Sequence, residues 1–184
     1  MATVSDKLLT LQEYAKLPDL GYPNELVRGR IVRMNPPQSR HGQVCSRVVR
    51  IIGNFADEHD LGHVLSNDCG VITERSPDTL RGADVAFYSF GRVPKGPLGE
   101  GYLELAPDVV VEVLSKFDRW PKVLAKVAEY LDAGVRVVCV LDPRKATAQL
   151  HRPDGDIEIL DGSQTLRLPE FGDSFAEPVS HFFE

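Results

Sequence analysis

The spacing of apolar residues predicts a chain in which helices alternate with strands. Apolar positions recur every three or four residues over 41–59 and 119–133, which predicts two helices. A shorter amphipathic helix is expected over 9–17, and Asp118 is the expected cap of the last helix. Strands are expected as a pair within 25–34, over 65–73, 83–90, 105–115 and 135–141, and as a hairpin over 147–151 and 156–160.

This order of elements predicts an α/β fold, with a mixed sheet flanked by helices and a C-terminal β-hairpin extension. The run Val109–Leu114 is rich in β-branched residues and apolar on both faces, so we expect it to be a central, buried strand. The length of 184 residues suits a single domain over 1–184. Residues 166–184 are expected to be irregular and anchored by phenylalanines.

Composition narrows the class of protein. With 42% hydrophobic and 26% charged residues, the chain is predicted to fold as an ordinary soluble globule rather than a disordered protein. Its longest apolar stretch, Val137–Leu141, is far short of the roughly 20 residues that span a membrane. No signal peptide is expected, and three separated cysteines without a CxxC pair favour a cytoplasmic location. The net charge of −6 argues against a general nucleic-acid coat protein, but not against an enzyme with a local basic patch.

Glu112 is the most unusual residue in this pattern, because it interrupts the predicted central strand. An ionised carboxylate at a buried position has a large desolvation cost unless a positive group compensates it. Three explanations are open: a bound divalent cation, a lysine or arginine nearby, or a strand that opens into a cleft or simply reaches solvent.

A metal ion would need a second carboxylate. Asp108 is about 13 Å along the same strand from Glu112, which is too far to share an ion. Asp84 is the better partner, since it leads another apolar strand and neighbouring strands lie about 4.8 Å apart. Oxygen ligands without a Cys/His set point to Mg²⁺ or Mn²⁺, ions that serve phosphate chemistry.

The predicted helix after Glu112 supplies a cation. Lys126 lies at the boundary of its apolar face, where a long stem is buried while the ammonium reaches a cleft. Taken alone, this position is also that of an ordinary surface lysine.

Six segments together resemble the Uma-two family of restriction-endonuclease-like proteins, within the PD-(D/E)XK nuclease superfamily. They carry, in order, the residues ELVRGRI (25–31), MNPP with a later histidine (34–41), RGADVAF (81–87), PDVVVEVLS (107–115), KVAEYLDAG (126–134) and DP (142–143). The resemblance covers most of residues 8–160.

The resemblance implies a restriction-endonuclease-like mixed β-sheet core. It makes Asp84 the first metal-binding acid and Glu112 the second, and it places the lysine of the superfamily at Lys126 on the following helix. The usual lysine position, two residues after the second acid, is Leu114 here, and Ala83 replaces the proline of the motif. Glu25 is a candidate third metal ligand, or alternatively a hairpin glutamate facing water.

Other residues have simpler readings. His41 touches a phosphate, caps its helix or lies on the surface, and Trp120 and Tyr130 are expected to be packing residues. The H-x-x-x-H spacing of His59 and His63 is a weak zinc signal. Arg40, Arg47 and Arg50 form either a phosphate-facing stripe or a solvated helix face.

The resulting hypothesis is a Mg²⁺-dependent or Mn²⁺-dependent endonuclease that hydrolyses DNA phosphodiester bonds, with Asp84, Glu112 and Lys126 as its catalytic residues. Cleavage of two antiparallel strands favours a homodimer. One alternative is a catalytically degenerate nuclease-fold module that binds nucleic acid or protein. Another is a hydrolase of a different phosphate ester.

Overall fold

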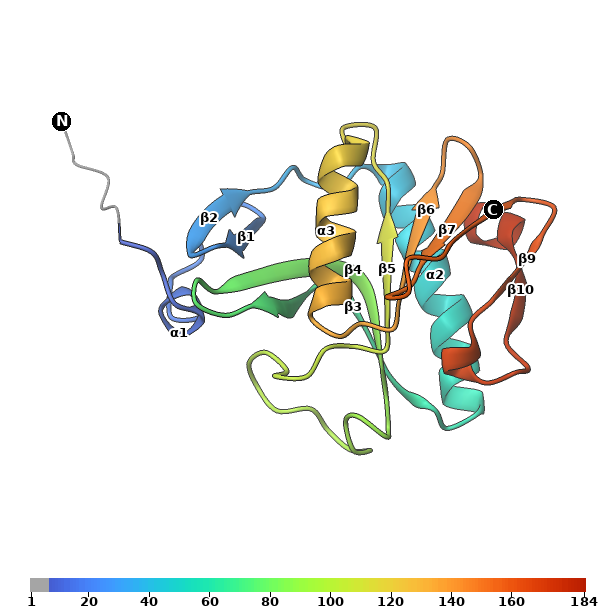
Figure 1. The fold of residues 1–184 in the computed structure, drawn as a ribbon, viewed down its shortest axis with the longest axis horizontal. Coiled ribbons are helices and arrows are strands. Elements are labelled where there is room, and N and C mark those ends of the chain that lie inside the picture. Colours follow the sequence, from blue (N-terminus) through green and yellow to red (C-terminus); the bar gives the residue numbers. More distant parts are fainter. Residues whose placement is uncertain (1–6) are drawn as a thin grey trace.

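An eight-stranded mixed sheet forms the centre of the computed structural model, which describes residues 7–184 (Figure 1). The strand order is β2-β1-β4-β5-β6-β7-β8, and β3 pairs with β4. Its strands are β1 (Asn24–Val27), β2 (Arg30–Arg33), β3 (Gly62–Glu74), β4 (Thr79–Ser89), β5 (Val109–Val113), β6 (Val137–Asp142), β7 (Thr147–His151) and β8 (Ile157–Asp161). The predicted α/β class, the central position of β5 and the β7–β8 hairpin are confirmed.

Two helices cover opposite faces of this sheet. In Figure 1, α3 (Trp120–Asp132) crosses in front of β4 and β5, whereas α2 (Ser39–Glu58) lies behind. Each helix anchors its own buried cluster: Val44, Val48 and Ile52 of α2 in one, Val127 and Tyr130 of α3 in the other. Because β5 lies between both clusters, its valines are buried on both faces, as its composition predicts.

The helix boundaries agree with the predicted ones, with one correction. Pro121 lies in the first turn of α3, and Gly134 follows the helix with a φ of 99°, a conformation that glycine adopts without strain. Asp118 does not cap α3, because Arg119 occupies the N-cap position. The Asp118 carboxylate instead accepts a hydrogen bond from the backbone N–H of Ser115 at 2.6 Å. The short helix α1 (Leu11–Tyr14) is capped by Thr10.

The C-terminal segment is more regular than predicted. It forms a two-stranded sheet, β9 (Thr165–Arg167) with β10 (Ala176–Pro178), and two 3-10 helices, η1 (Pro169–Phe171) and η2 (Val179–Phe183). Its phenylalanines join the core on the α2 face. Arg40 and Arg47 donate to the carbonyls of Phe183 and Glu184 at 2.7 and 3.1 Å. These two arginines therefore hold the C-terminal segment. Of the three arginines in the suggested phosphate-facing stripe, two thus have a structural role.

Two different strands, β1 and β5, pair with the same edge of β4 at separate positions. Because β3 pairs with β4 along most of its length, β1 and β5 must share the other edge. β1 pairs there at Leu80, and β5 pairs over Val85–Phe87. Within the described residues, positions 81–84 of β4 have no strand partner on this edge. The fork between β1 and β5 leaves backbone polar groups that side chains must satisfy.

None of the helices in residues 7–184 is both long enough and apolar enough to cross a membrane.

Candidate active site

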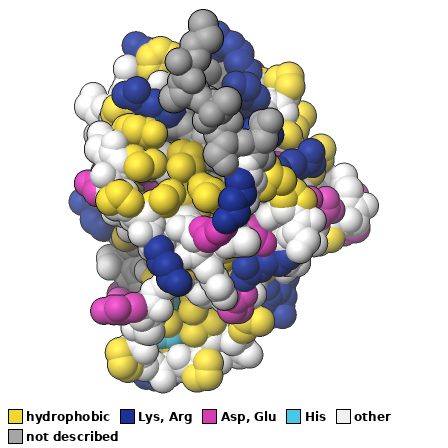
Figure 2. Space-filling view, turned by 90° about the vertical axis from the view of Figure 1, so that its left-hand side faces the viewer, with side chains coloured by type: hydrophobic (Ala, Val, Ile, Leu, Met, Phe, Trp, Pro, Cys, Tyr) yellow, Lys and Arg dark blue, Asp and Glu magenta, His cyan; other side chains and the backbone are white. Residues whose placement is uncertain are grey.

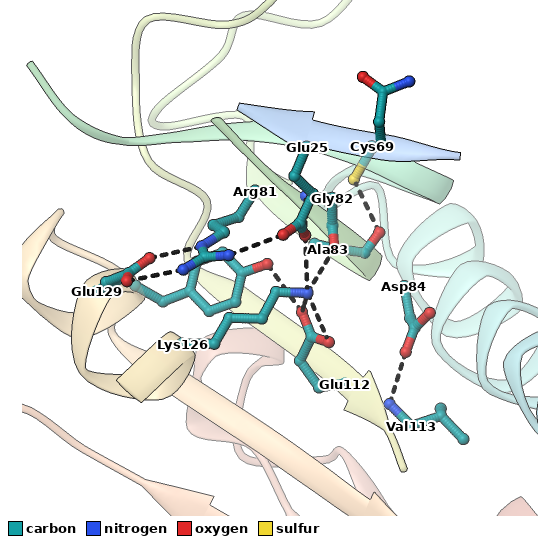
Figure 3. Close-up of polar contacts among 12 residues, drawn as sticks. Glu25, Cys69, Arg81, Gly82, Ala83, Asp84, Glu112, Val113, Lys126 and Glu129 are labelled. Atoms are coloured by element: carbon teal, nitrogen blue, oxygen red, sulfur yellow. Dashed lines mark hydrogen bonds and ion pairs between the residues drawn. The ribbon is translucent and has the colours of Figure 1, made fainter. Parts of the chain in front are cut away.

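Side chains from β1 and α3 occupy the fork and satisfy the backbone of Gly82. The N–H of Gly82 donates to Glu25 Oε1 at 2.9 Å, and its carbonyl accepts from Lys126 Nζ at 2.8 Å (Figure 3). Glu25 and Lys126 also form an ion pair at 3.3 Å. A carboxylate and an ammonium thus replace the missing strand, and both are fixed to the backbone of β4.

Glu112 is held by two donors from α3. Lys126 Nζ lies 2.9 and 3.0 Å from its two carboxylate oxygens, and the Tyr130 hydroxyl donates to it at 2.8 Å. Burial raises the pKa of Glu112 to about 7 despite the charge of Lys126, and the neighbouring Asp84 adds to this shift. Of the explanations offered for Glu112, the structure shows a lysine beside the carboxylate, and the Glu112 side chain is 14% exposed.

Tyr130 is more than the packing residue that its helical position predicts. Its ring is fully buried, but its hydroxyl bonds the Glu112 carboxylate. Burial and the charge of Glu112 raise its pKa well above the usual range of a phenol. The hydroxyl therefore stays protonated and acts as a donor.

Lys126 is the cation at the centre of the cluster. Desolvation opposes its charge, but Glu112 and Glu25 outweigh desolvation and raise its pKa. Its position at the boundary of the apolar face of α3, expected from the helical pattern, is confirmed by a side chain that is 17% exposed. Lys126 therefore remains an ammonium ion at neutral pH.

Arg81 closes the cluster on the side of α3. It forms a two-point contact with Glu129 at 2.6 and 2.8 Å and donates to Glu25 Oε2 at 2.8 Å. Burial raises and the charges of Lys126 and Arg81 lower the pKa of Glu25, and the net shift is downward. Glu25, whose alternative reading was a glutamate facing water, is only 4% exposed and is part of the cluster.

Asp84 lies on β4 at the point where pairing with β5 ends. Continuing the observed register by one residue places Asp84 opposite Glu112. The carboxylate of Asp84 accepts from the N–H of Val113 at 2.7 Å and lies 3.3 Å from His41 Nε2 of α2. Asp84 and Glu112 therefore lie on adjacent strands, and their carboxylates are held from different sides, Asp84 by His41 of α2 and Glu112 by Lys126 and Tyr130 of α3. Figure 3 shows the contacts of Asp84 with Val113 and of Glu112 with Lys126.

Asp68 is a further acid at this site that the sequence pattern did not reveal. It lies in a bulge of β3 between Ser66 and Cys69, and both Asn67 and Asp68 have left-handed backbone angles, with φ of 68° and 53°. Burial and the charge of Asp84 raise the pKa of Asp68. A β-bulge has no periodic pattern in the sequence. The one signal that could have identified Asp68 was the presence of an acid within a predicted strand.

The cluster as a whole carries more negative than positive groups. Glu25, Asp68, Asp84, Glu112 and Glu129 contribute carboxylates. Lys126 and Arg81 contribute positive charges, and the hydrogen bond to Asp84 raises the pKa of His41 to about 11, which makes it a third cation. Two carboxylates on adjacent strands with excess negative charge fit a hard divalent cation. Among residues 7–184, the His/Cys/Asp/Glu group whose ligand atoms lie within 4.8 Å of one another is His41, Cys45 and Asp84, and neither Glu25 nor Glu112 belongs to it.

Comparison with known proteins adds the family. The sequence matches Uma2, described as "Putative restriction endonuclease", over residues 11–180. The chain belongs to the Uma2 family. No curated protein matches it.

A solved structure has the same fold as this Uma2 chain. It is described as a "putative nuclease belonging to DUF820 from Anabaena variabilis ATCC 29413" and shares 23% identity. The match has a TM-score of 0.83 and covers 95% of this chain and 97% of that one. The expected restriction-endonuclease-like fold is confirmed, and family and fold together support a nuclease.

The histidines of this Uma2 chain have other contacts than the sequence suggested. His59 and His63 bond separate carbonyls, those of Phe55 and Pro94, and neither belongs to the metal-compatible cluster found among residues 7–184. His41 neither caps α2, whose N-cap is Gln38, nor lies on open surface. It reaches into the site and pairs with Asp84.

Proposed function

We propose that this Uma2 protein is a divalent-metal-dependent endonuclease that hydrolyses DNA phosphodiester bonds. The observation that carries the proposal is the fork in the sheet, where pairing of β4 with β5 ends next to Asp84 and Lys126 Nζ is fixed to Glu112 and Glu25. An excess of carboxylates around partly accessible oxygens supports a bound cation, and oxygen donors support Mg²⁺ or Mn²⁺.

In this proposal Asp84 and Glu112 hold the metal ion, and Glu25 assists from β1. When bound, the ion polarises a phosphoryl oxygen and lowers the pKa of a bound water. Glu25 also fixes Lys126 and the backbone of Gly82, which keeps the ammonium at the edge of the fork. Lys126 stabilises the negative charge that develops on the phosphoryl oxygens.

DNA is the proposed substrate, although the chain is acidic. On the face shown in Figure 2, Lys and Arg side chains form separate groups between apolar and acidic ones. Such a surface supports local phosphate contacts near the site rather than a continuous electrostatic coat. A panel with DNA, RNA and mononucleotides, each with Mg²⁺ or Mn²⁺, distinguishes a DNA nuclease from a hydrolase of another phosphate ester.

A plasmid-nicking assay tests the function. The wild-type protein should nick supercoiled DNA with Mg²⁺ or Mn²⁺ and not with EDTA, and Asp84→Asn should abolish nicking. Asp173→Asn, at an exposed loop position, is the matched control and should keep full activity. Equal nicking by wild type and Asp84→Asn would remove the proposal.

The degenerate-module alternative rests on the same cluster, because Lys126 already compensates Glu112 without a metal. It predicts a folded wild-type protein that neither nicks DNA nor binds Mn²⁺.

A homodimer is proposed as the active form. The edge strand β8 exposes Ile157 and Ile159 at 57% and 61%, and an apolar sheet edge supports contact with a second copy. Sedimentation should give a dimer for the wild type and a monomer for Ile159→Lys. A wild-type monomer that nicks DNA would contradict the dimer.

A further inference from the structure

Three donors of different chemistry converge where α2 meets Asp84. His41, Cys45 and Asp84 each offer a ligand atom, and these atoms lie within 4.8 Å of one another. His41 and Cys45 are four residues apart on α2, so they project from the same face of the helix. His41 and Cys45 lie outside the Lys126 cluster on the α3 side, and Asp84 is the acid that the two groups share.

The distances suit a tetrahedral ion. Zn²⁺ bonds of about 2.0 Å to nitrogen and oxygen and about 2.3 Å to sulfur imply a nitrogen–oxygen separation of about 3.3 Å and a nitrogen–sulfur separation of about 3.6 Å. His41 Nε2 lies 3.3 Å from Asp84 Oδ2 and 4.0 Å from Cys45 Sγ. Cys45 Sγ lies nearer to the other ring nitrogen, Nδ1, at 3.5 Å, so coordination through Nε2 requires the thiol to move toward Nε2.

We propose that His41, Cys45 and Asp84 form a site for a borderline-soft divalent cation of the Zn²⁺ class, and that an ion bound there withdraws Asp84 from the Mg²⁺ site. An imidazole and a thiolate select such an ion over Mg²⁺, which takes oxygen ligands. Zinc with three protein ligands keeps a fourth position for water. The second half of the proposal rests on the proposed function, since it assigns Asp84 to the catalytic ion.

The surroundings favour a cation at this position. Asp68 adds a negative charge that acts on both His41 and Cys45. The His41 side chain is 15% exposed and that of Asp84 10%, so both are shielded from water but reachable. Burial raises the pKa of the Cys45 thiol, and an ion that binds there must displace its proton.

Co²⁺ titration of metal-free wild-type protein tests the site without using activity. A thiolate bonded to Co²⁺ gives a charge-transfer band in the near ultraviolet, and Zn²⁺ should abolish the band by displacement. The wild type should show it at one equivalent, Cys45→Ser should lack it, and His41→Gln should bind at least tenfold more weakly. Cys69→Ser is the matched control, because Cys69 is a part-buried thiol outside the cluster, and it should keep the band.

Absence of the band from folded wild type, or its persistence in Cys45→Ser, would overturn the site. A Mn²⁺ titration tests the withdrawal of Asp84. One equivalent of Zn²⁺ should weaken Mn²⁺ binding at least tenfold in the wild type and leave it unaffected in Cys45→Ser. Equal Mn²⁺ affinity with and without Zn²⁺ in the wild type would overturn the withdrawal. If no metal supports nicking but the Co²⁺ band behaves as described, the proposed function fails and the soft-metal site stands.

Discussion

The two ends of β5 each carry a carboxylate in a buried setting, but the charges around them are opposite in balance. Asp108 immediately precedes the strand and is 1% exposed; Arg92 and Arg136 lie 3.0 and 3.1 Å from it. Glu112, near the other end, is 14% exposed and shares Lys126 with Glu25. Cations exceed carboxylates at Asp108, and carboxylates exceed cations at Glu112.

This difference separates a structural ion cluster from a candidate active site. Asp108 also accepts the N–H of Ser89 at 2.8 Å, and Arg92 bonds the carbonyls of Ala106 and Gly134, so the cluster joins three segments of backbone. The cluster at Glu112 has unbalanced negative charge beside a fork in the sheet. A buried acid in a strand therefore indicates function only when its neighbours leave room for a further cation.

The largest expected effect is on stability at the Asp108 end. Asp108→Asn should lower the free energy of unfolding by about 3 kcal/mol, the lower end for a broken buried ion pair, since both arginine heads retain access to solvent. Urea denaturation measures it. A loss below about 1 kcal/mol would show that the two ends of β5 do not differ as described.

The second-largest expected effect is the loss of nicking activity when Glu112, near the other end of β5, is replaced. Glu112→Gln should reduce nicking more than ~100-fold, beyond the usual cost of removing an outer partner of a metal ligand. Its free energy of unfolding should stay within about 1 kcal/mol of wild type, because the amide still accepts from Tyr130 and removes an unfavourable buried charge. Paired nicking and urea measurements check both. Full nicking activity in Glu112→Gln would show that Glu112, like Asp108, has only a structural role.

Removal of Lys126 should destabilise the protein by an amount that depends on pH, because Glu112 is then left without its cation. Lys126→Met should destabilise the protein by about 2 kcal/mol at pH 8 and by less at pH 5, where Glu112 takes up a proton. The pKa of Glu112, about 7, lies above the ordinary glutamate value of 4.5, so the folded state binds more protons and stability falls as pH rises between these values. The double variant Lys126→Met/Glu112→Gln should recover most of the loss at pH 8. Equal losses at pH 5 and pH 8 would contradict this account.

The smallest effect concerns a single hydrogen bond. Tyr130→Phe should cost about 1–2 kcal/mol, because a charged acceptor loses one donor while the ring stays buried. Thermal unfolding measures it, with the exposed-loop variant Asp173→Asn as control. No change in melting temperature would mean that the hydroxyl adds nothing to the Lys126 contact.

Local patterns were sufficient to predict the architecture. Helical periodicity identified α2 and α3, β-branched runs identified β5 and β6, and the boundary position of Lys126 followed from a helical wheel. The prediction that Asp84 comes from a strand next to that of Glu112 is also confirmed, because β4 pairs with β5.

Features that depend on long-range contacts were beyond these patterns. The bulge that brings Asp68 to the site has no periodic signal, and Tyr130 looks like any core aromatic until its hydroxyl meets Glu112. The joining of His41 and Cys45 with Asp84 required the docking of α2 against β4. The tail was misjudged because its short elements acquire order only by packing on α2.

Calorimetric titration of metal-free protein with Mn²⁺ tests the central claim that Asp84 and Glu112 together bind a hard divalent cation. Glu112 lies outside the proposed soft-metal set, so its effect is specific to this claim. The account predicts one Mn²⁺ per chain for the wild type and for Asp173→Asn, and no saturable binding for Asp84→Asn or Glu112→Gln. Equal Mn²⁺ affinity in the wild type and in Glu112→Gln would contradict it.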